Sequence, residues 1–191
     1  MKPLAEILAS QFDNSAYHIT RINTKHVSET MERLLRKAEK RHGLNRSEIA
    51  KKMLFMSHET YTPAQGGSSA AEVEALKYTF GEHASKITVT NTKGFTGHGM
   101  GVSLEDVVAI RSLNGGKLPP IANYKEPDPN LSGITLSQGG DYPCEYSLRL
   151  GAGFGSQIAM TLMKRTSKTS EPRITSSPQH QLWLKNISQL P

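Results

Sequence analysis

The chain has 191 residues, of which 36% are hydrophobic and 21% are charged. This length and composition are typical of one folded domain and exclude a disordered or fibrous protein. The single cysteine, Cys144, excludes an internal disulfide framework and a metal site built from several cysteines. The sequence lacks an apolar run long enough to span a membrane and the features of a secretory signal, so we expect a cytoplasmic protein without a membrane span.

The net charge of +6 raises the question of nucleic-acid binding. However, Lys and Arg alternate with Glu in helix-like stretches such as RLLRKAEKR and EIAKK, and they form no basic stripe with interleaved aromatic residues. We therefore expect no nucleic-acid partner. A mildly basic surface suits an acidic protein partner instead.

The first third of the chain predicts a strand and two helices. Residues 16–22 alternate well enough to form a strand, and Ser28 is the predicted N-cap of a helix that ends at Gly43. The apolar positions of this helix have helical spacing, and they are Met31, Leu34, Leu35 and Ala38. Asn45 and Glu48 form a capping-box-like pair that opens a shorter helix through Met53.

The middle of the chain alternates between strands and helices. A buried strand is predicted over residues 53–56, a helix from Ser68 or Ser69 to Gly81, and a strand over residues 87–91. The glycine-rich loop 93–101 leads into a helix that ends at Gly115 and Gly116. Four prolines predict that residues 118–133 form an irregular connection.

Two strand candidates follow over residues 146–152 and 156–164, joined by a tight turn. The order of elements predicts an α/β fold with a mixed sheet of about five strands and helices packed on it. In this sheet the early strands are parallel, and the last pair is antiparallel. The predicted domain covers residues 16–165, with an N-terminal extension over residues 1–15 and a polar, mobile tail over residues 166–191. Within the tail, residues 181–190 are a candidate docking segment through Leu182, Trp183 and Leu184.

Two histidines are placed where α/β sheets bind ligands. His58 lies at the carboxyl end of one predicted strand, and His98 lies in the glycine-rich loop after the next strand. A single histidine at such a position is more often structural than catalytic. Together with Lys93, however, the two imidazoles offer hydrogen-bond donors to a developing oxyanion.

Three motifs occur in a fixed order around these residues. The first is H-x-T-x-T, formed by His58, Thr60 and Thr62. The second is K-x-x-x-G-H, formed by Lys93, Gly97 and His98. The third is GAGFGSQIA, which contains Gly153, Phe154 and Gly155.

These motifs resemble those of the β-ketoacyl synthases, over about residues 16–164. The resemblance is to the carboxyl-terminal half of the synthase, which is one half of a thiolase-like fold. The sequences around His58 and His98 resemble those of a divergent branch among large iterative fatty-acid and polyketide synthases. Family members usually have glycine at the positions of Glu59 and Tyr61 and asparagine at the position of Gln157. Glu72 corresponds to the acidic residue that follows the first histidine motif in the family.

The resemblance implies a decarboxylative Claisen condensation between an acyl thioester and malonyl carrier protein. It implies no bound cofactor, since phosphopantetheine of an acyl carrier protein presents the substrates. His58 and His98 would stabilise oxyanions as neutral Nε2–H donors, and Lys93 would support His98 or an acidic neighbour. Thr60 and Thr62 would line the route of the phosphopantetheine arm. Phe154, between Gly153 and Gly155, would gate the acyl pocket.

The family also requires a nucleophilic cysteine at a helix N-terminus, and Cys144 lies after a proline and before a strand. We therefore expect a chain that is inactive alone and is completed by a cysteine-bearing ketosynthase half, or that forms a homo-oligomer. The alternative is a catalytically inactive module for dimerisation or carrier-protein docking. A gene fragment, a split enzyme, a self-associating remnant and an artificially shortened chain all fit the sequence.

Two further site types are weighed and set aside. Gly151, Gly153 and Gly155 resemble a dinucleotide fingerprint, but a strand-like run follows them where a helix is required. A metal site from His58 and His98 with Glu59 or Glu72 lacks any local ligand spacing, so we expect no metal.

Overall fold

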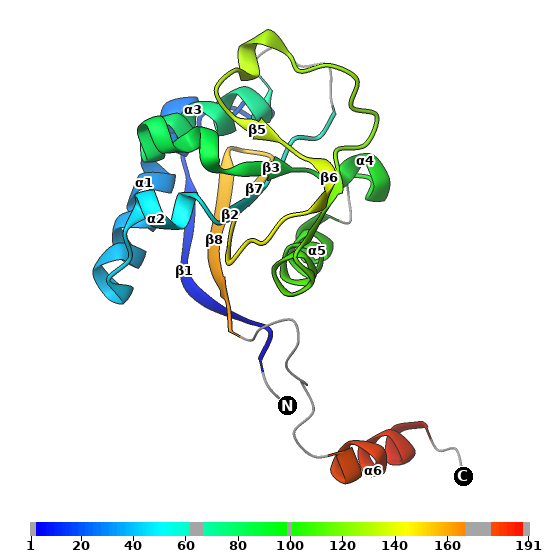
Figure 1. Ribbon diagram of the computed structural model, residues 1–191. Helices are drawn as coiled ribbons and strands as arrows, with labels where there is room; N and C mark the ends of the chain where they lie inside the picture. Colours follow the sequence, from blue (N-terminus) through cyan, green and yellow to red (C-terminus); the bar gives the residue numbers. More distant parts are fainter. Residues whose placement is uncertain (1–2, 62–66, 99–100, 167–176, 189–191) are drawn as a thin grey trace.

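The computed structural model describes residues 3–61, 67–98, 101–166 and 177–188. These residues form a six-stranded sheet with the strand order β1-β8-β7-β2-β3-β5, helices on both of its faces, and a separate pair of strands, β4 and β6 (Figure 1). The strands are β1 (Ala5–Asn14), β2 (Met53–Met56), β3 (Thr88–Thr90), β4 (Lys117–Pro120), β5 (Thr135–Leu136), β6 (Gln138–Asp141), β7 (Tyr146–Gly153) and β8 (Gln157–Arg165). The helices are α1 (Thr24–His42), α2 (Arg46–Ala50), α3 (Ser68–Phe80), α4 (Lys93–Thr96), α5 (Gly101–Gly115) and α6 (Ser177–Ser188), with 3₁₀ turns η1 (Gly81–Lys86) and η2 (Pro129–Leu131).

The directions of the strands confirm the predicted mixed α/β sheet. β2 pairs in parallel with β3 and β7, and β3 pairs in parallel with β5. β8 is antiparallel to both of its neighbours, β7 and β1. The sheet has six strands where about five were predicted, and the additional strand is β5 at one edge.

The prediction for the first strand was wrong. The strand is β1, and its pairing with β8 runs from Ala5 opposite Arg165 to Asn14 opposite Gln157. Residues 5–14 are therefore part of the domain sheet and not an N-terminal extension. Residues 16–22 form no strand, because the His18 ring accepts hydrogen bonds from the backbone N–H groups of Thr20 and Arg21 and holds a local turn.

The helix boundaries follow capping residues. The N-cap of α1 is Asn23, whose side chain accepts from the N–H of His26, so the predicted cap at Ser28 was wrong. Gly43 ends this helix in the left-handed conformation, as predicted, with a φ of 63°. Asn45 caps α2 as predicted, but the helix ends at Ala50. The predicted strands over 53–56, 87–91, 146–152 and 156–164 and the helix from Ser68 are confirmed within a few residues.

The connection predicted to be irregular, residues 118–133, contains most of β4 and the 3₁₀ turn η2, and the short strands β5 and β6 follow it. β4 pairs with β6 across a long loop, and β5 extends the main sheet beside β3. Prolines lie within β4, which is tolerated because this strand is at the edge of a two-stranded sheet. The glycine-rich loop contains the one-turn helix α4.

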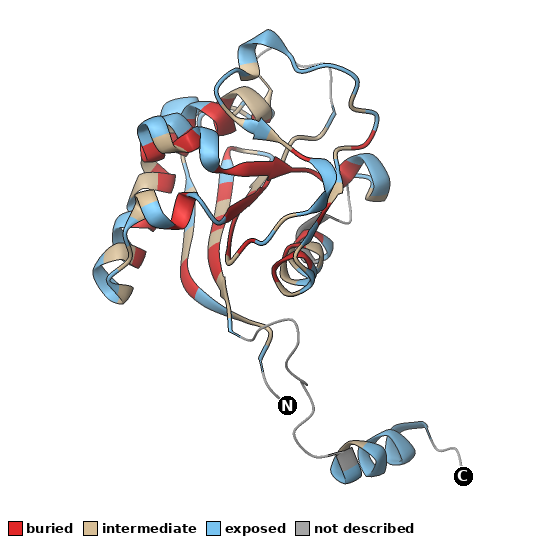
Figure 2. Ribbon diagram, viewed as in Figure 1, coloured by how far each residue is buried: buried red, intermediate tan, exposed pale blue. Residues whose placement is uncertain are grey.

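Two apolar clusters lie on opposite faces of the sheet. Figure 2 shows that buried residues are concentrated in the central strands and on parts of the helices. Met53 and Phe55 of β2 point to the face covered by α1 and α3, whereas Leu54 and Met56 point to the face covered by α5. This alternation explains why β2 is apolar throughout: both faces of a central parallel strand are covered. Cys144 belongs to the cluster beneath α5.

The predicted tail contains the helix α6, which overlaps the candidate docking segment 181–190. Four large apolar side chains of this helix are exposed, and they are Leu182, Trp183, Leu184 and Ile187. No helix in the described ranges is both long and apolar enough to cross a membrane.

The turn between β7 and β8 yields a stability prediction. Ser156 is buried with a φ of 62°, and its hydroxyl accepts from the N–H of His18 and donates to the carbonyl of His18 or Arg21, at 3.0 and 3.2 Å. Replacing Ser156 by Ala removes these bonds and keeps the strained φ, so we expect the free energy of unfolding to fall by about 1–3 kcal/mol in urea denaturation. Ser156→Gly relieves the strain and should lose less. An alanine variant as stable as the glycine variant would contradict this account.

Candidate active site

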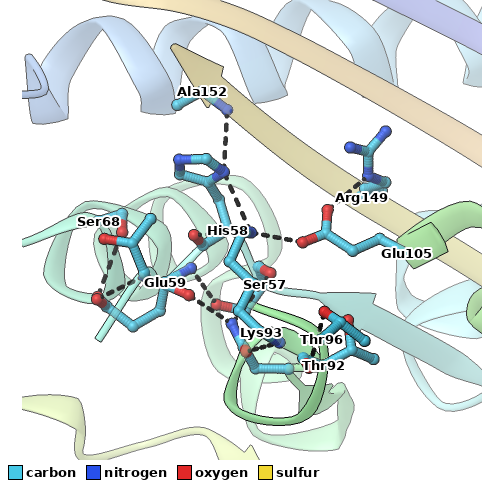
Figure 3. Close-up of polar contacts among 12 residues, drawn as sticks. Ser57, His58, Glu59, Ser68, Thr92, Lys93, Thr96, Glu105, Arg149 and Ala152 are labelled. Carbon is cyan, nitrogen blue, oxygen red and sulfur yellow. Dashed lines mark hydrogen bonds and ion pairs between the residues drawn. The ribbon is translucent and has the colours of Figure 1, made fainter. Parts of the chain in front are cut away.

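His58 follows β2 at the carboxyl edge of the sheet, where two backbone contacts fix it (Figure 3). Its N–H donates to the carboxyl group of Glu72, and its ring Nδ1 accepts from the N–H of Ala152 at 3.2 Å. A nitrogen that accepts a hydrogen bond carries no proton, so this contact assigns the proton of the neutral ring to Nε2.

The surroundings of His58 keep the ring neutral. The pKa of His58 is lowered from 6.5 to about 3, first by burial and then by the positive charge of Lys93 and the neighbouring His98. The imidazole therefore remains an uncharged hydrogen-bond donor at neutral pH.

Lys93 begins α4 and is buried, with 2% of its side chain exposed. Its ammonium group forms an ion pair with Glu105, donates to the backbone carbonyl of His58 at 3.0 Å, and lies 3.4 Å from Nδ1 of His58. The backbone N–H of Lys93 donates to the side chain of Asn91, whose amide in turn donates to the carbonyls of Ser57 and Glu59. Lys93 and Asn91 together tie the start of α4 to the segment that carries His58.

Glu105 and Arg149 complete this buried network, and sequence reasoning missed both. One carboxylate oxygen of Glu105 pairs with Lys93, and the other pairs with the Nε of Arg149 at 3.1 Å. Arg149 also pairs with Asp106 at 3.1 Å. An arginine within the apolar strand segment YSLRLGA was the signal in the sequence, because a charge at a buried strand position requires a partner.

His98 lies close to His58, as predicted, and is exposed. The two ring centroids are 6.1 Å apart, with an angle of 65° between the ring planes. Both histidines and Lys93 line a cavity of about 680 Å³, so the structure brings the three predicted site residues together. Its opposite wall is formed by β1, β7 and β8, through residues that include Phe12, Asn14, Gly151, Gly153 and Ile158.

Among the described residues predicted to bind substrate, only Gly153 lines this cavity. Thr60 is partly buried two residues after His58, whereas Thr62 lies outside the described residues. Gly153 lines the cavity. Phe154 is 75% exposed in the following turn and is not a lining residue, and Gly155 has a φ of 80°.

Glu59 and Tyr61, which replace the usual glycines, have clear structural places. The carboxylate of Glu59 accepts hydrogen bonds from the N–H groups of Ser69, Thr60 and Tyr61, and so caps the start of α3. Burial opposes ionisation, but these hydrogen bonds outweigh it and lower the pKa of Glu59. Tyr61 has a φ of 58°, in the region that favours glycine.

Glu72 has the opposite protonation preference from Glu59. Its two oxygens accept from the hydroxyl of Ser57 and the N–H of His58, but complete burial raises its pKa to about 8. At neutral pH the group is therefore mostly an uncharged carboxylic acid.

Cys144 is structural, as predicted, and lies away from the histidines. It precedes β7, whereas Ala152, which contacts His58, is near the end of the same strand, roughly 20 Å further along. Burial raises the pKa of the Cys144 thiol to about 11, so it is not a reactive thiolate.

Neither of the alternative sites is formed. The glycines from Gly151 to Gly155 lie in the β7–β8 hairpin and do not open a helix, which excludes the dinucleotide fingerprint. In the parts of the chain that the structure describes, no cluster of three or more His, Cys, Asp or Glu side chains could hold a metal ion.

The protonation of His58 can be measured by NMR titration of its ring signals. With a folded pKa of about 3 against an ordinary value of 6.5, we expect the ring to remain neutral at pH 5. The unfolded chain then binds more protons than the folded chain between these values. The contribution of His58 to stability is therefore complete above pH 6.5 and is lost as the pH falls toward 3. A midpoint near 6.5 would refute the buried, neutral ring.

The carboxylate of Glu105 can be tested by Glu105→Gln. This change leaves Lys93 and Arg149 buried without their shared anion, so we expect a loss of about 3–5 kcal/mol in the free energy of unfolding, measured by chemical denaturation. Glu82→Gln is the matched control, because the Glu82 side chain is 88% exposed, and it should change stability by less than about 0.5 kcal/mol. Equal effects of both substitutions would contradict the network.

Comparisons with known proteins agree with this geometry. The family model "Beta-ketoacyl synthase, C-terminal domain" matches residues 4–125 and so includes β1. The 3-oxoacyl-[acyl-carrier-protein] synthase 2 of Coxiella burnetii is 31% identical over 126 residues, which are 65% of this chain and 28% of that protein. The enzyme of the same name from Staphylococcus aureus is 29% identical over 164 residues, 84% of this chain and 38% of that protein.

Solved structures show the same fold. A β-ketoacyl synthase from Burkholderia phymatum has a TM-score of 0.71 and 21% identity, with 85% of this chain and 38% of that chain covered. The ishigamide ketosynthase/chain length factor has a TM-score of 0.71 and 20% identity over the same shares. The chain spans less than two fifths of the length of these relatives. On the family match, with the motif histidines gathered in one cavity, this chain belongs to the β-ketoacyl synthase family and carries its C-terminal domain.

Proposed function

We propose that this chain supplies the two-histidine half of a β-ketoacyl synthase active site for fatty-acid or polyketide synthesis. The reaction is a decarboxylative Claisen condensation of an acyl thioester with malonyl carrier protein. The observation that carries the proposal is the neutral His58 ring, with its Nε2–H available beside His98 at one cavity.

The chemistry requires neutral donors. Loss of carbon dioxide from the malonyl thioester leaves the electron pair of the broken bond on an enolate, whose negative charge lies on the thioester oxygen. Attack of the enolate carbon on the acyl thioester then forms a tetrahedral oxyanion, which expels the nucleophilic thiolate. N–H donors that are already oriented toward these oxygens stabilise both charges. His58 and His98 are the residues we assign to this task.

Lys93 acts as a positioning residue in this proposal. Its ammonium group contacts the backbone carbonyl and lies beside Nδ1 of His58, which fixes the ring and opposes protonation. Glu105 balances the charge of Lys93 in the buried network. The positive charge therefore acts on His58 without competing for the substrate oxygen.

The substrates would arrive on the phosphopantetheine of an acyl carrier protein, and no other cofactor is proposed. One structural neighbour is a type II polyketide ketosynthase in complex with its acyl-carrier protein, at 22% identity and a TM-score of 0.68. Thr60 and Thr62 follow His58 in the motif and would offer hydroxyl groups to the amides of the arm. The net charge of +6 favours an acidic carrier.

A second half would provide the nucleophilic cysteine, because Cys144 is buried at the opposite edge of the sheet. Exposed apolar side chains mark the surface that such a half, or a second copy of this chain, would cover. They are Ile7 and Phe12 of β1 and Leu104 and Val107 of α5.

The test is reconstitution. The pure chain is mixed with malonyl carrier protein and an acyl carrier protein, with and without a cysteine-bearing ketosynthase half, and the β-ketoacyl product is measured by mass spectrometry. We expect product only with the second half present. His58→Ala and His98→Ala should each lower the rate at least about 100-fold, because an oxyanion donor is lost.

His83→Ala, in η1, is the control and should leave the rate unchanged. Formation of the β-ketoacyl product by the pure chain would refute the proposal that this chain supplies only half of the active site. Equal rates for the unchanged chain and for His58→Ala would refute the role of His58 as an oxyanion donor. An associated pair without activity would support the alternative, a catalytically inactive module for dimerisation or carrier docking.

A further inference from the structure

A second cavity, of about 300 Å³, lies on the other side of the segment that carries His58. It shares no lining residue with the cavity of the histidines. Its walls are α3, the ends of β2 and β3, and the proline-rich loop that follows β4. The apolar lining comes mainly from Phe55, Val73, Leu76, Val89, Leu131 and Leu136. The carboxyl ends of parallel strands are where α/β sheets bind small ligands, and this volume is at the lower end of ligand pockets.

The ionisable side chains around this cavity are acids and phenols, namely Glu59, Glu72, Glu126, Asp128, Tyr61 and Tyr124. Among the described residues that line it, none is Lys, Arg or His. Glu59 is ionised, since hydrogen bonds at the start of α3 lower its pKa against the effect of burial. Glu126 and Asp128 are exposed, so they lie at the mouth of the cavity. This charge distribution repels carboxylates and phosphates and attracts cations.

We infer that this cavity binds a small organic cation with an apolar body, of the alkylammonium class. The apolar part lies against Val73, Leu76 and Leu131, and the ammonium group lies beside the carboxylates of Glu126 and Asp128. The site is separate from the condensation chemistry proposed above, whose malonyl substrate is an anion, and it does not require a second half.

A ligand bound in this cavity would affect His58 through the residues next to it in the chain. Ser57 and Glu59, which flank His58 in the chain, both line the second cavity. Ser57 donates to Glu72, and Glu72 accepts the backbone N–H of His58. A ligand in the cavity therefore contacts the residues that fix the backbone of His58.

Three ligands with the same apolar chain test the inference: hexylammonium, hexanol and hexanoate. Each is titrated into the full chain and followed by NMR, including the ring signals of His58. We expect hexylammonium to bind most tightly, hexanol more weakly and hexanoate not at all, and we expect the His58 signals to shift. The ring signals of His42, which is at the end of α1 and contacts the backbone carbonyl of Leu8 in β1, should remain unchanged.

Two variants separate the apolar and the charged contributions. Leu131→Trp fills the cavity from the partly exposed turn η2 and should abolish binding. The double substitution Glu126→Gln with Asp128→Asn should weaken hexylammonium about fivefold or more and leave hexanol unchanged. Glu82→Gln is the charge control and should change neither affinity.

Binding of hexanoate as tightly as hexylammonium, or no binding of any of the three, would overturn the inference. So would hexylammonium binding that neither variant alters, or that leaves the His58 signals in place. If circular dichroism shows that Leu131→Trp unfolds the chain, the affinity of the double variant Glu126→Gln with Asp128→Asn for hexylammonium tests the inference on its own.

Discussion

The arrangement of the candidate site depends on one buried carboxylate, that of Glu105. It pairs with Lys93 of α4 and with Arg149 of β7, so a single side chain of α5 joins the preceding helix to a strand much later in the chain. A buried charge is stable only with such partners. Through Lys93 the same network reaches the backbone and ring of His58 and lowers its pKa. The neutral state of the candidate oxyanion donor therefore comes first from burial and then from the charge of Lys93, which is paired with Glu105 of α5.

Local patterns in the sequence were sufficient for most of the fold. Apolar runs and capping residues placed β2, α3, β7 and β8, because each of these elements is encoded by its own residues. β1 was missed because a register irregularity between Ile7 and Ala9 breaks its alternation, and because its partner lies at the other end of the domain. β4 and β6 were missed because proline and glycine obscure short strands whose pairing depends on long-range contact.

The candidate site was predictable where a motif identified it. His58, Lys93 and His98 were found from their spacing, and the structure brings them to one cavity. Glu105 and Arg149 were not found. An acidic residue on a helix is expected to be exposed to solvent unless the strand that packs against it, here the strand with Arg149, is known. Similarly, nothing local showed that the carboxylates of Glu59 and Glu72, thirteen positions apart, have pKa values shifted in opposite directions.

The pairing of β1 with β8 has a consequence for biosynthesis. Within this domain β1 is synthesised well before β8, its neighbour in the sheet, since Ala5 lies opposite Arg165. Until β8 is made, the N–H and C=O groups of β1 lack this strand partner and can pair with other chains. Such a distant pairing also slows folding, because a long loop must close before any contact between the two strands is made. The topology of the sheet therefore carries a risk of aggregation during synthesis. α1 and α3, which contact each other, can pack together before the sheet is complete.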